Sequence, residues 1–280
     1  MTGRVVVTGA GGYIGRHVVA ELLRRDFDVV ACDLALSGID VRATLLTDDI
    51  FAADHGLYDR LGCPDTLIHL AWKDGFVHNA LSHMENLSAH VRFLTHMAEA
   101  GCARIAVMGT MHEVGYHEGV VDENTPCVPL SQYGVAKNAL RQSMMLWMAN
   151  RATTFCWLRA FYIVGDDVRG NSIFSKIAQA VAKGERTFPF TSGQNRYDFI
   201  DIDNLARQIV AASTQDAVTG VINVCTGQPV SLADRVERYI ADNGYDIRLD
   251  YGAFPDRAYD SPEIYGDATK ISEIMRNNHA

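Results

Sequence analysis

The sequence predicts an α/β protein with a doubly wound parallel sheet and a smaller, partly intertwined C-terminal α/β lobe. Apolar runs of strand length alternate with amphipathic segments of helix length, and the first run leads directly into a glycine-rich turn. Nearly continuous apolar strands are typical of parallel sheets that helices cover on both faces, with right-handed crossovers. Together these observations predict a sheet of the Rossmann type. We expect its strands at residues 4–8, 28–32, 66–70, 104–108 and 154–160.

Between these strands, amphipathic segments predict helices at residues 14–25, 79–100 and 131–150. After about residue 160 the pattern changes, because glycine and aspartate interrupt the chain more often. We therefore expect a first domain over residues 1–160 and a smaller lobe over residues 161–280. The lobe is predicted to contain helices at 172–183, 204–213 and 232–243, and short strands at 199–202 and 221–224.

Composition and charge exclude several classes of protein. The 280 residues are 48% hydrophobic and 21% charged, as in ordinary globular chains, and the formal net charge is −9. So acidic a chain repels polyphosphate, which argues against nucleic acid or an anionic membrane as a partner. Without a signal-peptide pattern or an apolar run of membrane-spanning length, we expect a cytoplasmic protein. The cysteines have neither CxxC spacing nor a zinc-site cluster, so we expect free thiols and no metal; they are Cys32, Cys63, Cys102, Cys127, Cys156 and Cys225.

Three glycines follow the first expected strand at intervals of three residues: Gly9, Gly12 and Gly15. Such a turn tolerates positive φ, lets a diphosphate approach closely and presents the N–H groups of a helix N-terminus. Asp33 follows the second strand, where a carboxylate accepts hydrogen bonds from an adenosine ribose and repels a 2′-phosphate. The pattern predicts that residues 1–160 bind NAD, with NADP as the alternative cofactor. The simpler interpretation is that the glycine turn binds no ligand and that Asp33 only caps a strand.

Tyr133 and Lys137 are four residues apart in an expected helix, which places both side chains on one face. A nearby ammonium favours the phenolate and lowers the pKa of the phenol. Such a pair can give a proton to a carbonyl oxygen while a hydride moves from nicotinamide. Thr110 follows the strand expected at 104–108, at the carboxyl edge where α/β sheets bind ligands, so its hydroxyl could hold the reacting oxygen. A chance Y-x-x-x-K match and a turn-capping Thr110 are the alternatives, which the glycine turn makes less attractive.

Taken together, the motifs resemble the extended branch of the short-chain dehydrogenase/reductase family over nearly the whole chain. Asp49 and Ile50 resemble its adenine-contacting pair, and Asn86 resembles the asparagine of its N-x-x-G-T element, although Ala89 and His90 replace the glycine and threonine. The resemblance implies a catalytic set of Thr110, Tyr133 and Lys137 and a substrate-binding C-terminal lobe. The cofactor contacts that it implies are Gly9, Gly12, Tyr13, Ile14, Gly15, Asp33, Asp49, Ile50, Leu70, Ala71, Trp72 and Lys137.

The same resemblance implies a nucleoside-diphosphate sugar as the substrate. Arg196 and Arg257 resemble family arginines that bind the diphosphate, and a guanidinium makes paired hydrogen bonds to phosphate oxygens. Salt bridges to neighbouring aspartates are the alternative for both. Asn171 occupies the family's substrate-loop position, and His112 and Trp72 are expected beside the sugar. The expected substrate contacts are Thr110, His112, Tyr133, Asn171, Arg196 and Arg257.

Departures from the family pattern narrow the expected reaction. Family dehydratases carry an Asp-Glu pair directly after the catalytic threonine, where this sequence has Met111 and His112. Glu113 stands one residue further on, and its side chain could still enter the site. Tyr162 replaces the asparagine that many epimerases carry near the substrate. The histidines between residues 78 and 117 lack the i, i+4 pair with a carboxylate found in metalloproteases, so we expect solvent-facing or pocket-lining roles.

The stretch 69–141 is most similar to reductases of 4-keto-6-deoxy sugar nucleotides. The resemblance implies NAD(P)-dependent reduction of the keto group, at C4, of a nucleotide-activated 6-deoxyhexulose in deoxysugar and surface-glycan synthesis. A nucleotide-sugar 4-epimerase that retains NAD is the second hypothesis, and a dinucleotide-sensing regulator without catalysis is the third. Residues 144–148 are apolar around the whole expected helix, which together with the family's four-helix interface implies a homodimer.

Overall fold

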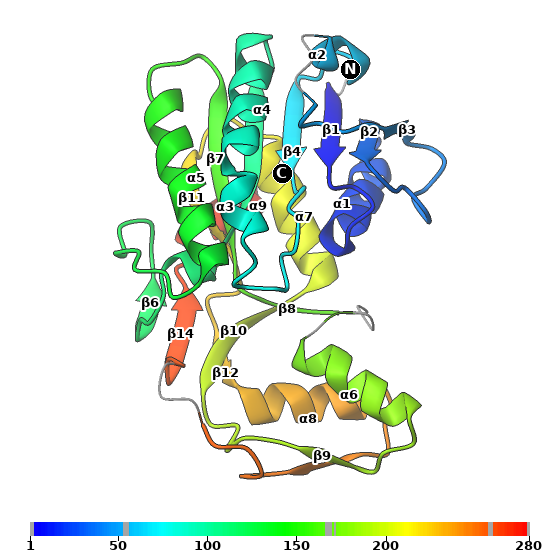
Figure 1. Cartoon of the computed structure of the whole chain (residues 1–280), viewed down its shortest axis with the longest axis vertical. Helices are drawn as coiled ribbons and strands as arrows, with labels where there is room; N and C mark the ends of the chain where they lie inside the picture. The colour runs from blue at the N-terminus through cyan, green and yellow to red at the C-terminus, as the bar shows by residue number, and fades with distance from the viewer. Residues whose placement is uncertain (1–2, 53–55, 166–169, 171, 257–259, 279–280) are drawn as a thin grey trace.

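A parallel sheet forms the centre of the molecule. The structure is a computed structural model, which describes residues 3–52, 56–165, 170, 172–256 and 260–278. Within these residues the sheet has seven strands in the order β11-β7-β5-β4-β1-β2-β3, all paired in parallel. The strand order reverses between β1 and β4, so the sheet is doubly wound as predicted (Figure 1). Its strands are β1 (Arg4–Thr8), β2 (Asp28–Asp33), β3 (Thr44–Thr47), β4 (Thr66–His69), β5 (Arg104–Thr110), β7 (Thr154–Ala160) and β11 (Gly220–Val224).

Both faces of this sheet are buried, which explains the unbroken apolar run in β1. Val5 and Val7 lie in one core cluster, while Val6 between them lies in a second cluster on the opposite face. The first face is covered by α1 (Tyr13–Arg24) and α7 (Ile202–Ser213), which pack against each other. The second face is covered by the packed pair α4 (Leu87–Glu99) and α5 (Gln132–Met148), in front of the sheet in Figure 1.

The smaller lobe is built around β10 (Arg196–Asp201), below the large sheet in Figure 1. β10 pairs in parallel with β8 (Tyr162–Val164) and β14 (Glu263–Gly266), and antiparallel with β12 (Pro229–Ser231). β14 also pairs with β6 (Gly119–Val121), and β13 (Arg248–Asp250) pairs with β9 (Thr187–Pro189). The remaining elements are α2 (Leu57–Arg60), α3 (Ser82–Glu85), η1 (Met111–Glu113), α6 (Ile173–Ala182), α8 (Leu232–Asp242) and α9 (Thr269–Asn277).

The two lobes exchange elements, which confirms the predicted intertwining. β11 joins the large sheet although it lies after residue 160, and α9 packs against α7 and β11. In the opposite direction, β6 lies before residue 160 but pairs with β14 of the smaller lobe. The domain boundary at residue 160 stays a prediction, because β11, which follows it, belongs to the large sheet and β6, which precedes it, pairs in the smaller lobe.

One predicted helix was wrong. The segment 79–100 is not a single helix, because residues 78 and 79 cap another one: the carbonyl of His78 accepts from Tyr133 N at 2.9 Å, and Asn79 Oδ1 accepts from Gln132 N at 3.2 Å. The helical part is then split at Asn86, which ends α3 and begins α4. Residues 78 and 79 serve as hydrogen-bond acceptors for the first N–H groups of α5, and this role competes with their becoming the first residues of the predicted helix.

In the described residues, no helix is long and apolar enough to cross a lipid bilayer. The six cysteines are free thiols, and Cys63 differs from the buried majority because its side chain is exposed.

Candidate active site

The glycine turn is built by close backbone contacts. Gly9 has φ +72°, and a Cβ there would lie 2.5 Å from the backbone nitrogen of Ala71. A Cβ on Gly15 would lie 2.1 Å from the Gly9 carbonyl oxygen. Both glycines are therefore required by the packing of β1, β4 and α1, whatever else they bind.

The start of α1 also fits a diphosphate. Gly12 is the N-cap residue and offers no side-chain cap, and the first turn carries no acidic residue. The positive end of the helix dipole is therefore not offset by an acidic side chain in the first turn of α1. The residues present thus suit the diphosphate of a dinucleotide.

Residues predicted for the adenosine end surround this turn. Asp33 ends β2, where its two carboxylate oxygens accept from Gly11 N at 3.0 Å and from Leu34 N at 2.7 Å. These bonds hold the carboxylate beside the glycine turn. Asp49 is exposed and accepts from Phe51 N at 3.0 Å, whereas Ile50 is a buried core residue.

Three other predicted contacts are fixed by packing. Leu70 N donates to the Thr8 carbonyl at 3.0 Å, which extends the β1–β4 pairing past His69. Ile14, in the first turn of α1, packs on the core. The Tyr13 hydroxyl lies so close to Gly165 that a Cβ on Gly165 would be 2.2 Å from it. Tyr13 thus links the glycine turn to the end of β8.

Thr110, Tyr133 and Lys137 meet at the carboxyl edge of the sheet. Thr110 is the last residue of β5 and therefore lies within the strand, which is longer than predicted. Tyr133 and Lys137 lie one turn apart in α5, and the Thr110 side chain is close enough to act on the pKa of the Tyr133 phenol by hydrogen bonding. The close approach of α5 to residues 111–113 depends on Gly134, because a Cβ on Gly134 would lie 2.4 Å from the His112 carbonyl oxygen.

Burial dominates the electrostatics of this set. It raises the pKa of Tyr133, although the hydrogen bond with Thr110 acts in the opposite direction. It lowers the pKa of Lys137 to about 7, against the effect of Glu113. The expectation that the ammonium lowers the pKa of the phenol is not met here, because desolvation of the phenolate is the larger effect and the Lys137 Nζ is 6.0 Å from the Tyr133 ring centroid.

Lys137 is held by two neighbours. Its Nζ donates to the Met108 carbonyl at 2.7 Å and lies 3.8 Å from the centroid of the Trp72 indole. The Trp72 ring also stacks on His90 at 4.4 Å. Predicted cofactor contact Trp72 is thus placed directly against the predicted catalytic lysine.

Histidine rings surround Tyr133, and sequence reasoning gave two of them no specific role. The ring of His78 stacks on Tyr133 at 5.7 Å, and those of His83 and His112 lie 5.4 and 6.1 Å away. Burial lowers the pKa of His112 to about 4 and that of His78 as well, so both rings are neutral near pH 7. No spacing in the sequence signals this arrangement, because His78 and His83 arrive from the separate segment before α4.

Arg196 begins β10 and faces the solvent, with 54% of its side chain exposed. Its Nε lies 3.1 Å from Glu263 Oε2, and its Nη2 donates to the Pro229 carbonyl at 2.9 Å. The structure therefore shows a salt bridge of the kind weighed as the alternative, on an arginine that remains accessible. Arg257 and Asn171 lie outside the described residues.

Glu113 does not enter the site. Its side chain is fully buried and accepts from Trp157 Nε1 of β7 at 2.9 Å, so it faces the interior of the protein. The expectation that Glu113 could reach a substrate was wrong, because the interior supplies it with hydrogen-bond donors. Among the described residues, no group of three or more His, Cys, Asp or Glu side chains could hold a metal ion.

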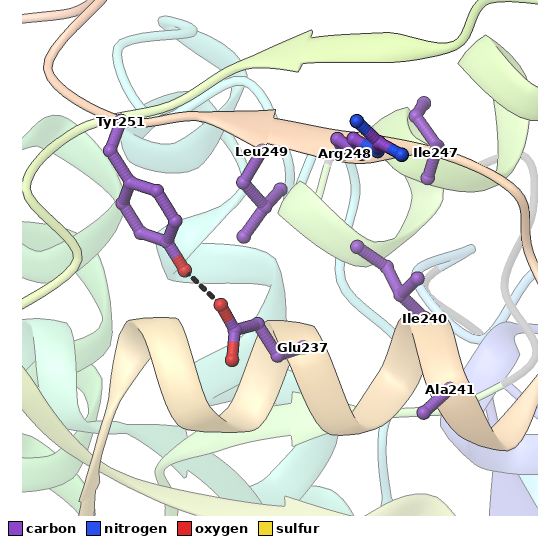
Figure 2. A pocket seen from close by; sticks show the side chains of 7 residues that line it. All are labelled: Glu237, Ile240, Ala241, Ile247, Arg248, Leu249 and Tyr251. Atoms are coloured by element: carbon purple, nitrogen blue, oxygen red, sulfur yellow. Dashed lines mark hydrogen bonds between the residues drawn. The ribbon is translucent and has the colours of Figure 1, made fainter.

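A cavity of about 340 Å³ opens between α8 and β13 in the smaller lobe. Figure 2 shows that Tyr251 closes one end of it by donating a hydrogen bond to Glu237 at 2.5 Å. Its lining consists of Glu237, Ile240, Ala241, Ile247, Arg248, Leu249 and Tyr251. Because none of these is a candidate site residue, the cavity is separate from the carboxyl edge of the large sheet.

A glycine turn that suits a diphosphate, close to a threonine, a tyrosine and a lysine, is the arrangement expected of a dinucleotide-dependent oxidoreductase. Residues 5–225 match the model of the NAD dependent epimerase/dehydratase family, and the chain belongs to that family. This confirms the resemblance to extended short-chain dehydrogenases/reductases and the NAD cofactor.

One curated relative is the dTDP-6-deoxy-L-talose 4-dehydrogenase (NAD(+)) of Aggregatibacter actinomycetemcomitans, 43% identical over 94% of this chain and 98% of its own. Among solved structures, the UDP-N-acetylglucosamine 4-epimerase of Methanobrevibacter ruminantium has a TM-score of 0.83 at 21% identity, covering 98% of this chain and 92% of its own. The UDP-glucose 4-epimerase of Thermus thermophilus in complex with NAD has a TM-score of 0.80 at 19% identity, covering 98% and 93%. These two structures support the fold.

Proposed function

We propose that this enzyme interconverts a keto group and a hydroxyl at C4 of a nucleotide-activated 6-deoxyhexose, and acts as an NAD-dependent 4-ketoreductase. The observation that carries the proposal is the meeting of Thr110 at the end of β5 with Tyr133 and Lys137, one helical turn apart in α5, at the edge of the sheet that carries the glycine turn. The name of the 43%-identical relative, a 4-dehydrogenase of a dTDP-linked 6-deoxy sugar, supports the same redox step in the opposite direction.

The side chains divide the work of this step. Tyr133 donates its phenolic proton to the ketone oxygen, Thr110 hydrogen-bonds the same oxygen, and Lys137 is proposed to contact the cofactor. When bound, NADH supplies the hydride for the carbonyl carbon. Water then returns a proton to Tyr133. Dehydration is not favoured, since Met111 and His112 lack an acid function for it and Glu113 is turned away.

The proposed substrate contacts come from both lobes. His112 and Trp72 present neutral rings next to Tyr133, suited to an uncharged sugar. Arg196 and Arg257 are proposed to bind the nucleoside diphosphate, with Arg196 exchanging its contact with Glu263 for the phosphates, and Asn171 is proposed as a further substrate contact. At the other end, Asp33 favours NAD over NADP because its carboxylate would face a 2′-phosphate.

The first test is a cofactor balance. The enzyme is purified, its bound nucleotide is extracted and quantified, and 4-keto-6-deoxy and 4-hydroxy sugar nucleotides are added with and without NADH or NADPH. A reductase consumes one NADH per keto sugar and shows no turnover without added NADH. Turnover of a 4-hydroxy sugar into its C4 epimer, with tightly bound NAD and no added cofactor, would instead establish the 4-epimerase that the two structural neighbours suggest.

Replacing Arg196 with alanine is expected to raise KM for the nucleotide sugar about 10-fold or more, because charge-assisted hydrogen bonds to the diphosphate are lost. The Kd for NADH should stay unchanged, since Arg196 lies on the smaller lobe. Steady-state kinetics and a fluorescence titration measure the two constants. Arg186→Ala is the matched control, because Arg186 is also an exposed arginine of this lobe, paired with Asp246. Equal KM values for the two variants would remove Arg196 from the substrate site.

We also propose a homodimer through α4 and α5. Met144 and Met148 of α5 are buried within the subunit, whereas Leu146 between them is 81% exposed. An apolar side chain so exposed on a helix that packs against α4 is suited to a partner helix. Light scattering at micromolar concentration gives the mass, and a monomer would contradict the proposal.

A further inference from the structure

Glu113 is a fully buried carboxylate directly behind the proposed catalytic edge. Its Oε1 accepts from the backbone N–H of Thr110 at 2.7 Å and from Trp157 Nε1 at 2.9 Å. In the same turn, the Thr110 hydroxyl accepts from His112 N at 3.3 Å. Glu113 and Thr110 therefore hold each other in a reciprocal cap at the start of η1.

Two arginines balance the charge of Glu113. Its Oε2 lies 3.6 Å from Nη2 of Arg159, which is 0% exposed, and 3.4 Å from Nε of Arg141, which is 15% exposed. Burial raises the pKa of Glu113, while the Arg159 charge and the bonds from Thr110 and Trp157 act in the opposite direction. Since all of these neighbours are donors or cations, they fit the ionised carboxylate and offer nothing to a protonated one.

The strand is shaped to admit this cluster. A Cβ on Gly109 would lie 2.1 Å from Trp157 Nε1 and 2.7 Å from Glu113 Oε1. Gly109 directly precedes Thr110, so the absence of a side chain is what lets the carboxylate and the indole reach the end of β5. The arrangement therefore belongs to the same few residues that present the Thr110 hydroxyl.

We propose that Glu113 is a positioning residue for the C4 redox step, which it serves by fixing the backbone of Thr110 so that the hydroxyl meets both Tyr133 and the ketone oxygen. This rests on the proposed function. Unlike the acid pair of dehydratases, Glu113 touches no substrate; it acts through the residue that does. The Thr110 hydroxyl also accepts from His112 N of η1 and acts on the pKa of Tyr133, so its position is sensitive to any movement of η1.

The charge of Glu113 supplies a readout that a purely structural role would lack. The carboxylate favours the protonated forms of both Lys137 and Tyr133, and so raises the pKa of each. Removing the negative charge must therefore lower both pKa values. Removing a neighbouring positive charge must raise them, because the carboxylate is then less compensated.

The central experiment is Glu113→Gln, which keeps the size of the side chain and an oxygen for Thr110 N. The second carboxylate oxygen, which faces Arg159 and Arg141, becomes an NH₂ group that must turn away from these donors and so disturbs the position of Thr110. We therefore expect kcat to fall about 10-fold or more with KM changed less than about 2-fold. The midpoint of the kcat pH profile should move down by about one pH unit. Arg141→Gln should move it upwards, and the exposed Glu118→Gln, near η1, should leave kcat and the profile unchanged.

A second readout needs no turnover. The titration of the Lys137 ε-CH₂ group by NMR, assigned with Lys137→Met, is expected near the wild-type pKa of about 7 and lower in Glu113→Gln. If the wild-type enzyme reduces no 4-keto sugar, the proposed function fails while this titration still tests Glu113. An unshifted Lys137 titration, or an unchanged kcat, in a folded Glu113→Gln overturns the inference. If Glu113→Gln does not fold, Arg141→Gln decides instead. An upward shift in the midpoint of the kcat pH profile then supports the inference, and no shift or a downward shift overturns it.

Discussion

Replacing Tyr133 with phenylalanine is expected to lower kcat for the 4-keto sugar by about 10²–10⁴-fold, the usual contribution of a general acid. The variant loses only the phenolic hydroxyl, which is proposed to give its proton to the ketone oxygen. The ring remains, so its stacking on His78 and its edge contact with Trp72 are kept. The Kd for NADH should therefore change less than about 2-fold. Stopped-flow reduction and a fluorescence titration provide the two numbers.

Tyr116→Phe is the matched control for this experiment. Tyr116 is 49% exposed and donates its hydroxyl to Glu118 at the surface, so activity should be that of the wild type. Full activity in Tyr133→Phe would contradict the proposed mechanism. Binding of NADH without any turnover, in the wild type and the variant alike, would instead favour the third hypothesis of a dinucleotide-sensing regulator.

Replacing Gly9 with alanine is expected to lower the free energy of unfolding by about 3 kcal/mol or more and to weaken NADH binding about 10-fold or more. Two effects add. The positive φ of +72° is strained for any residue with a Cβ, and that Cβ would meet the backbone of Ala71 and Leu70 at 2.5 to 2.8 Å. Because these are backbone atoms, β1 and β4 must move apart, and the diphosphate turn moves with them. Urea unfolding and isothermal titration with NADH measure the two quantities.

Gly38→Ala separates strain from contact. Gly38 has φ +81°, but a Cβ added there would meet nothing within 4 Å, so only the backbone strain applies. We expect a loss of about 1–2 kcal/mol and an unchanged Kd for NADH. If both variants lose the same stability and neither loses affinity, the close approach of β1 and β4 at Gly9 has no role in binding.

The elements that the sequence predicted well are those with a strong local pattern. β1 has the predicted limits, because Val5, Val6 and Val7 are each buried on one of two covered faces and no polar residue interrupts them. Short edge elements such as β3, with mostly exposed residues in the sequence TLLT, were not predicted, since their pairing depends on a neighbouring strand. The broken helix before α4 was missed for a similar reason: the need to cap α5 arises only when distant segments meet.

Within the site, the glycine turn and the Tyr133–Lys137 pair follow from spacing along one strand, turn or helix. The ring of histidines does not, because His78, His83 and His112 approach Tyr133 from different segments. A signal for Glu113 did exist, since Arg159 lies in an otherwise apolar strand and a buried guanidinium needs a counter-charge. Which acid supplies it, however, depends on the pairing of β5 with β7.

The amino-acid sequence by itself determined the chemistry on offer: a turn without side chains for a diphosphate, a phenol and an ammonium on one helical face, and a hydroxyl at a strand end. Each of these features involves residues only a few positions apart in the sequence, so the local geometry of a strand, turn or helix fixes their arrangement. Only the tertiary structure decided the environment of those groups, including the desolvation that brings the pKa of Lys137 to about 7 and the turning of Glu113 away from the substrate side. The physical reason is that burial and charge balance are sums over neighbours from β4, β5, α5 and β7, which become neighbours only when the sheet forms.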